Sequence, residues 1–241
     1  MVEFDRRTLD MRAGTGAAID EGLRTHMLRV YNYMSLGLGI TGVVAFFFNQ
    51  WVMSSPAIAQ TVYGSPLQWV IVLAPLAFVL GLSFGINKMS FATAQLAFWG
   101  FAVAMGLSLA SIFLVYTGAS IAKVFFITAA TFGSMSLWGY TTKRDLTGMG
   151  SFLMMGLIGL IIASVVNIFV GSSALEFGIS IIGVLIFVGL TAYDTQKIKE
   201  SYLESDGSET IGKKAIMGAL TLYLDFINLF LMMLRLFGNR N

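Results

Sequence analysis

The sequence contains no cysteine, a single histidine and few charged residues. Without cysteine, the chain can have no disulfide, no thiolate metal ligand and no cysteine nucleophile. The one histidine, His26, lies in a polar N-terminal stretch, which argues against a Ser-His catalytic pair or a histidine-rich zinc site inside a membrane. Charged residues make up 12% of the chain, about half of what is usual in a soluble domain. We expect a protein that needs lipid around it and that is not an enzyme.

Long apolar runs replace the missing charge. Hydrophobic residues make up 56% of the 241 residues, and the mean hydropathy is +0.79. Several runs reach the roughly 20 residues that cross a bilayer core as a helix, and they are continuously apolar, whereas the strands of a membrane barrel alternate. The sequence predicts an all-α membrane protein with a cytoplasmic tail over 1–27 and a membrane domain over 28–241. Its seven expected transmembrane helices are 29–50, 67–87, 91–116, 121–141, 150–171, 174–196 and 214–237.

The distribution of basic residues predicts the orientation. With a cytoplasmic N-terminus, twelve of the 15 Lys and Arg residues fall inside, and only Lys123, Arg235 and Arg240 fall outside. The positive-inside rule therefore favours a multi-pass protein with its N-terminus in the cytoplasm. We prefer a full seventh crossing, although a re-entrant last segment would return Arg235 and Arg240 to the cytoplasmic side.

Two acidic residues stand in or beside apolar segments. Asp225 lies near the centre of the last one, where a carboxylate costs about 2.5–3.5 kcal/mol, so it should face protein or water. Asn228 follows one turn later, on roughly the same face, and could line a polar path. Asp194 lies at the cytoplasmic end of the sixth segment. Each aspartate also has a plainer interpretation: Asp225 as a neutral packing residue, and Asp194 as a boundary residue in water near Lys197.

A more specific hypothesis pairs the two carboxylates across a helix interface. Mutual repulsion would then make the pair share one proton near neutral pH. Deprotonated, Asp194 and Asp225 would offer oxygen ligands that could bind Ca²⁺ transiently, and protonated they could join their helices by a hydrogen bond. Lys88, at the end of the second segment, could act as a cationic latch for Asp194, or could simply determine topology.

The stretches TAYDTQKI (191–198) and ALTLYLDFINLFLMMLRLFG (219–238) resemble the Bax inhibitor-1 family, and GLRTHMLRVYNYMSLGLGITG (22–42) looks like its bacterial members. The resemblance implies six helices packed around a central seventh, an inner-membrane location and a pH-sensitive calcium leak. In eukaryotic relatives it also implies suppression of cell death. Carried over by motif, Asp194 and Asp225 would be the diaspartyl pH sensor of the family, and Lys88 the only match to its basic latch.

Three functional hypotheses follow. The first is a pH-sensitive leak channel for Ca²⁺ or for cations in general, gated by the two aspartates. The second is a non-conducting regulator that binds a membrane quality-control protease or other membrane proteins, and the third is a proton-coupled solute transporter. Beyond these partners we expect the lipid bilayer but no nucleic acid, and no resident cofactor, with Ca²⁺ only as a transported ion.

Overall fold

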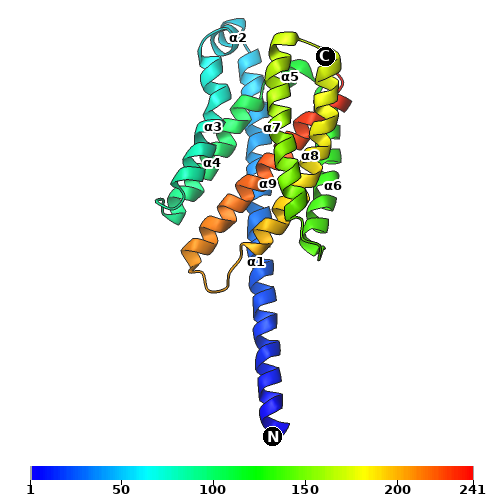
Figure 1. Cartoon of the computed structure of the whole chain (residues 1–241). Coiled ribbons are helices and arrows are strands. Elements are labelled where there is room, and N and C mark those ends of the chain that lie inside the picture. Colours follow the sequence, from blue (N-terminus) through cyan, green and yellow to red (C-terminus); the bar gives the residue numbers. More distant parts are fainter. Residues whose placement is uncertain (1, 241) are drawn as a thin grey trace.

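The structure, a computed structural model, describes the backbone of residues 2–240 and the side chains of residues 21–240, and most of this backbone is helical. Figure 1 shows the helices as an elongated bundle, with the first part of α1 projecting beyond one end. The helices are α1 (Val2–Met53), α2 (Pro56–Tyr63), α3 (Leu67–Gly85), α4 (Phe91–Leu109), α5 (Ile112–Val115), α6 (Gly118–Thr141), α7 (Thr147–Val170), α8 (Ser173–Glu200) and α9 (Ser208–Phe237).

Seven segments of the described chain are long and apolar enough to cross a membrane, which confirms the predicted fold class. The seven are Glu21–Met53, Leu67–Gly85, Phe91–Val115, Gly118–Thr141, Thr147–Val170, Ser173–Glu200 and Ser208–Phe237. The expected 91–116 segment is interrupted near its end, where α4 gives way to the short helix α5. The first and last helices, α1 and α9, begin before their apolar runs. In both, the helix also includes the polar residues that precede the run.

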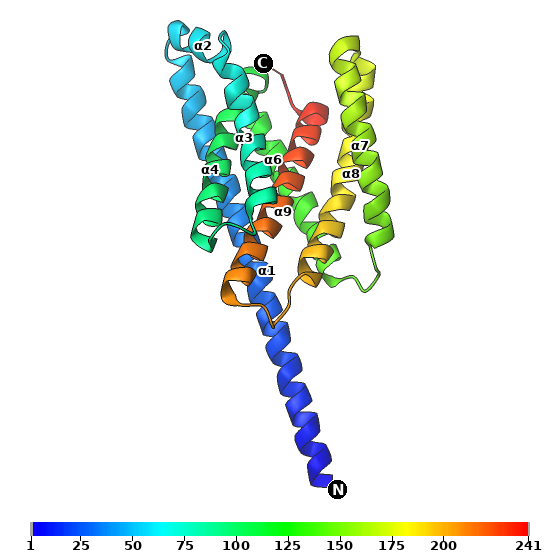
Figure 2. The same cartoon turned by 60° about the vertical axis from the view of Figure 1, so that its left-hand side comes forward.

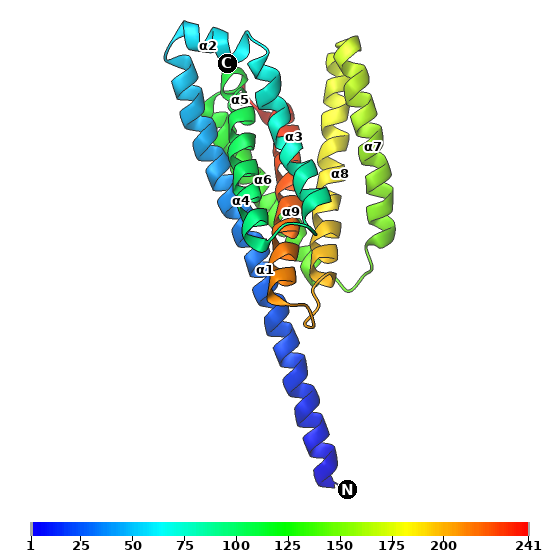
Figure 3. The ribbon, with the colours of Figure 1, turned by 90° about the vertical axis from the view of Figure 1, so that its left-hand side faces the viewer.

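The C-terminal helix α9 occupies the centre of the bundle. Within its apolar stretch 72% of the residues are buried inside the protein, against 6% for α7. Helices α1, α3, α4, α6 and α8 all pack on α9, whereas α7 packs on α8. Figures 2 and 3 show α7 and α8 as a pair to one side of α9. The predicted central seventh helix is confirmed. Helix α7 lies at the periphery, where it packs mainly on α8, a neighbour of α9.

Close helix crossings depend on glycine. A Cβ added at Gly139 of α6 would collide with the backbone of Ala192 in α8, and one added at Gly106 of α4 would lie 2.8 Å from the carbonyl oxygen of Thr41 in α1. Small residues let helix backbones approach closely where lipid gives helices little hydrophobic reason to associate. These two contacts hold α6 on α8 and α4 on α1.

The last helix crosses the whole bundle. Figure 1 places the N- and C-termini at opposite ends. Beyond α9, the backbone N–H of Thr117 donates to the carbonyl oxygen of Asn239 at 3.1 Å, and the N–H of Asn239 donates to Ser120 Oγ at 2.8 Å. Arg240 also approaches Glu176, at the start of α8, to 3.8 Å. The preferred full seventh crossing therefore describes the structure, and the re-entrant alternative does not.

Candidate functional site

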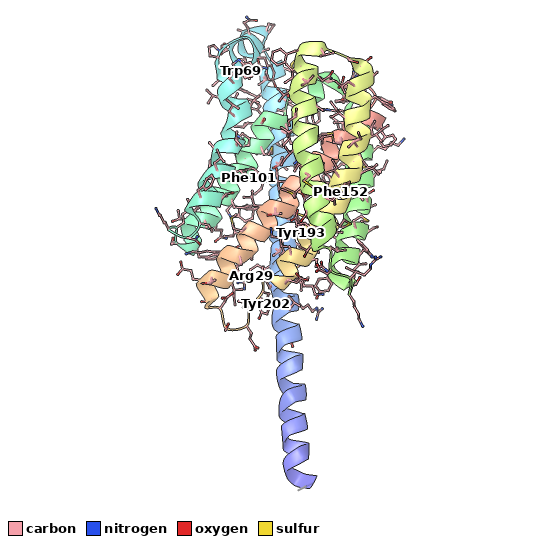
Figure 4. All side chains as sticks on the ribbon, in the orientation of Figure 1. Arg29, Trp69, Phe101, Phe152, Tyr193 and Tyr202 are labelled. Carbon is pink, nitrogen blue, oxygen red and sulfur yellow. The ribbon has the colours of Figure 1, made fainter. Side chains whose placement is uncertain are left out.

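The two predicted aspartates meet where α8 and α9 cross. Their carboxyl groups lie within hydrogen-bonding distance of each other. Asp225 is 6% exposed, and Asp194 is half-buried. Figure 4 labels Tyr193, the residue before Asp194, in the middle of this region. A carboxylate only accepts hydrogen bonds, so a bond between these two groups requires that one of them carries a proton.

The crossing explains how two residues at different positions in their helices reach the same depth. Asp194 lies six residues before the end of α8, about 9 Å along the axis, and Asp225 lies 17 residues after the start of α9, about 25 Å along it. Figure 1 shows that α9 runs obliquely across α8, starting well to one side of the end of α8. Because α9 is tilted, its centre comes level with the last turns of α8.

The surroundings of the pair contain little countercharge. Lys197, one turn after Asp194, is close enough to interact with it electrostatically, and its ammonium lies 5.9 Å from the centre of the Tyr193 ring. The recorded ion pairs of the described side chains include neither aspartate. One carboxyl oxygen of Asp225, Oδ2, is buried without a hydrogen-bond donor among the described residues. An unpaired charge is costly at this depth, so the pair is suited to hold either a proton or a cation.

Thr195 connects the same turn of α8 to two other helices. Its hydroxyl lies 2.8 Å from Ser136 Oγ in α6, and that oxygen lies 2.6 Å from the phenol oxygen of Tyr31 in α1. The Thr195 hydroxyl also donates to the carbonyl oxygen of Thr191 at 2.7 Å. This hydrogen-bonded chain runs from α1 through α6 to the residue beside Asp194, inside the protein.

Gln196 holds the connection between α6 and α7. Its side-chain oxygen accepts from the backbone N–H of Leu146 at 2.9 Å, and its amide nitrogen donates to the carbonyl oxygen of Arg144 at 2.9 Å. In the same connection, the hydroxyl and backbone N–H of Thr147 donate to Asp145, and these bonds hold the pKa of Asp145 below its usual value. The three consecutive residues Asp194, Thr195 and Gln196 therefore each contact a different part of the protein.

The two other predicted site residues lie elsewhere. Asn228 lines a cavity of about 320 Å³ between α7, α8 and α9, together with Ser164 and Phe187. Lys88 lies in the turn between α3 and α4, where it is exposed and, among the described residues, makes no ion pair. The structure therefore brings Asp194 and Asp225 together and does not bring Lys88 to them. The cation beside Asp194 is Lys197, on the same helix.

Two carboxylates do not make a complete calcium site. Calcium usually takes six to eight oxygen ligands. Within the described chain there is no group of three or more His, Cys, Asp or Glu residues placed to hold a metal ion. A Ca²⁺ ion at the pair would therefore keep much of its water.

Several polar residues around the site were not singled out from the sequence. Besides Tyr31 and Ser136, Tyr223 of α9 is completely buried, and its hydroxyl lies 2.6 Å from Thr41 Oγ1, which donates to the carbonyl oxygen of Ala102. Ser136 and Tyr223 are single polar residues among apolar neighbours, whereas Tyr31 stands next to Asn32 in a more polar stretch. That signal is common in membrane helices, and only the helix contacts show which of these residues meet.

The chain is thus a seven-span helical membrane protein whose central C-terminal helix carries a buried aspartate paired with a second one on the preceding helix. The family model described as "Inhibitor of apoptosis-promoting Bax1" matches residues 23–241. The chain belongs to this Bax inhibitor family, which confirms the resemblance noted in its sequence.

Close relatives agree with this assignment over almost the full chain. The chain is 51% identical to the Rickettsia prowazekii protein RP147 over 221 residues, which cover 92% of each chain. It is 48% identical to the inner membrane protein YbhL of Escherichia coli K12 over 222 residues, 91% of this chain and 93% of YbhL. A Borreliella burgdorferi protein is 44% identical over 216 residues, 89% of this chain and 91% of that protein. The chain is accordingly an inner-membrane protein of a family that is not known for enzymatic activity.

Proposed function

We propose that this protein is a pH-sensitive leak pathway for Ca²⁺, or for cations in general, gated by Asp194 and Asp225. The observation that supports this function is the contact between the two carboxyl groups at the crossing of α8 with the central helix α9. Between Lys214 and Arg235 of the central helix, Asp225 is the one Asp, Glu, Lys or Arg residue, so the pair is where this stretch could receive a cation.

The gate follows from the chemistry of the pair. With one shared proton, a hydrogen bond between the carboxyls joins α8 to α9. When the proton leaves, two negative charges repel each other in apolar surroundings and present oxygen ligands to a cation. Cation flux should therefore rise as the pH increases through the range in which the pair loses its shared proton.

Two cavities that each contain some polar side chains lie between Asn228 and the external end of the bundle. The cavity beside Asn228 also contacts Ser164. Ser164 lines a second cavity of about 240 Å³, together with Asn167, Glu176 and Arg235 near the outer ends of α7, α8 and α9. These side chains would provide water-bound ions with hydrogen-bond partners along a path that is otherwise apolar.

Flux into liposomes tests the proposal. Purified protein is reconstituted around a calcium indicator, and Ca²⁺ entry is measured from acidic to alkaline pH for wild type, Asp194→Asn and Asp225→Asn. Each substitution keeps the side-chain shape but removes the charge, so we expect alkaline flux to fall by about tenfold, which corresponds to about 1.4 kcal/mol of lost cation stabilisation. The pH dependence should flatten in both variants. Glu204→Gln, an exposed acidic residue in the α8–α9 loop, is the matched control and should behave as wild type.

Two outcomes would overturn this function. If flux through Asp225→Asn kept the wild-type pH dependence, the aspartate pair would not be the gate. No flux above that of empty liposomes would favour the non-conducting regulator, and co-purification of a membrane quality-control protease would then support that alternative.

A further inference from the structure

A groove along the membrane-facing side of α1 and α6 is independent of the aspartate pair. Both helices pack on α9 but have little contact with each other. Between them is a cavity of about 760 Å³ whose inner wall includes Phe226 of α9. Its lining is mostly apolar, with Met34 and Leu38 from α1 and Ala129 and Phe132 from α6.

The groove opens sideways into the bilayer. Leu28 and Leu137 on its two sides are 51% and 63% exposed. Gly39 of α1 and Gly133 of α6 line it as well, and a Cβ added at either position would meet no atom within 4 Å. These glycines therefore do not serve a close helix contact, as Gly139 does. They leave the groove wide.

The groove has the depth of one leaflet and a basic mouth. From Met27 to Gly39 it extends about 18 Å along α1, slightly more than half of the roughly 30 Å hydrocarbon core. Arg24 and Tyr140 line its cytoplasmic end. The ammonium of Lys199 donates to the carbonyl oxygen of Tyr140 at 2.8 Å and lies 5.3 Å from the centre of its ring. The recorded ion pairs of the described residues include neither Arg24 nor Lys199.

The size of the groove decides between a lipid chain and a helix. A transmembrane helix about 10 Å across and 30 Å long occupies roughly 2,000 Å³ or more, well above the volume of the groove. An acyl chain has the width of a single methylene group. It therefore fits in the groove beside Gly39 and Gly133. Since an acyl chain gains little by leaving other lipid for an apolar groove, selectivity must come from the headgroup.

We propose that the groove binds an acyl chain of an anionic phospholipid from the cytoplasmic leaflet, with the lipid phosphate at Arg24. A guanidinium forms strong charge-assisted hydrogen bonds to phosphate, and the nearby Lys199 adds positive charge. The bound chain lies over the hydrogen bond between Tyr31 and Ser136, which also line the groove. The lipid therefore covers the outer end of the hydrogen-bonded chain that leads to Thr195.

Lipid titrations of the full-length protein in detergent, followed by native mass spectrometry, test this site. Phosphatidylglycerol should bind more tightly than phosphatidylcholine. Gly133→Leu fills the groove and should weaken phosphatidylglycerol binding by about tenfold. Gly159→Leu is its control, because Gly159 is exposed on α7 and its added Cβ also meets no atom within 4 Å.

A second pair of variants tests the headgroup. Arg24→Gln should reduce the preference for phosphatidylglycerol while phosphatidylcholine binding stays unchanged. Lys88→Gln, an exposed cation at the same end of the protein, should leave both unchanged. The proposal is overturned if Gly133→Leu binds lipid as Gly159→Leu does, if the two lipids bind equally to wild type, or if glycerol phosphate without acyl chains binds as well. It is also overturned if Gly133→Leu instead abolishes a dimer of this chain, since the groove would then hold a helix.

Discussion

Asp194, Thr195 and Gln196 show how one helical turn can serve three partners. Successive side chains on an α-helix point about 100° apart, so neighbours in sequence face different elements. Asp194 faces α9, Thr195 faces α6, and Gln196 reaches the connection between α6 and α7. The position of Asp194 relative to Asp225 therefore depends on contacts made by the next two residues.

The contact of Gln196 is open to a direct stability test. Gln196→Leu keeps the side chain large but leaves the N–H of the buried Leu146 without its partner, which costs about 1–3 kcal/mol. We expect a lower thermal unfolding temperature for the detergent-solubilised variant. Gln68→Leu, on the exposed first turn of α3, should change it little. Equal unfolding temperatures for the two variants would contradict a structural role of Gln196.

Among the helices, glycine positions separate protein-facing from lipid-facing surfaces. Gly139 and Gly133 lie six residues apart on α6, but the first touches α8 and the second faces the open groove. Nothing in their local sequence distinguishes them, because both stand in apolar surroundings. The difference arises only from the position of α8.

This contrast predicts opposite responses to one substitution. Gly139→Val must push α6 away from Ala192, and overpacking of this kind typically costs about 1–3 kcal/mol. Gly133→Val adds the same side chain to the same helix without a collision. Thermal unfolding in detergent should show a clear loss of stability for Gly139→Val only. Similar losses in both variants would attribute the effect to helix propensity, and not to the α6–α8 contact.

At the scale of the whole molecule, an odd number of crossings places the two termini on opposite sides of the membrane. The contacts of Asn239 and Arg240 with the α5–α6 turn and the start of α8 hold the C-terminus at the external end. The ion pair with Glu176 stabilises Arg240 at the external end, although most Lys and Arg residues of the chain lie on the cytoplasmic side. The N-terminus is cytoplasmic by that distribution.

Reporter fusions check this topology. Alkaline phosphatase, which is active only outside the cytoplasm, should be active when fused after Asn241. Green fluorescent protein, which folds in the cytoplasm, should be dark at the same position and fluorescent at the N-terminus. Fluorescence from the C-terminal fusion would instead support a re-entrant last segment with a cytoplasmic C-terminus. A fusion after Glu204, in the cytoplasmic α8–α9 loop, serves as the internal reference.

The seven spans, the orientation and the unusual placement of the two aspartates can all be predicted from the amino-acid sequence. Each of these depends on local properties: the length of an apolar run, the positions of Lys and Arg, and the cost of a carboxylate in hydrocarbon. Three further facts could not be predicted in this way: Asp194 reaches Asp225, Lys88 lies apart from both, and α7 is peripheral. These facts depend on the tilt and rotation of helices against one another. Lipid and protein interior are both apolar, so hydrophobicity does not distinguish the protein-facing side of a membrane helix from its lipid-facing side. The contacts between helices are therefore set by packing.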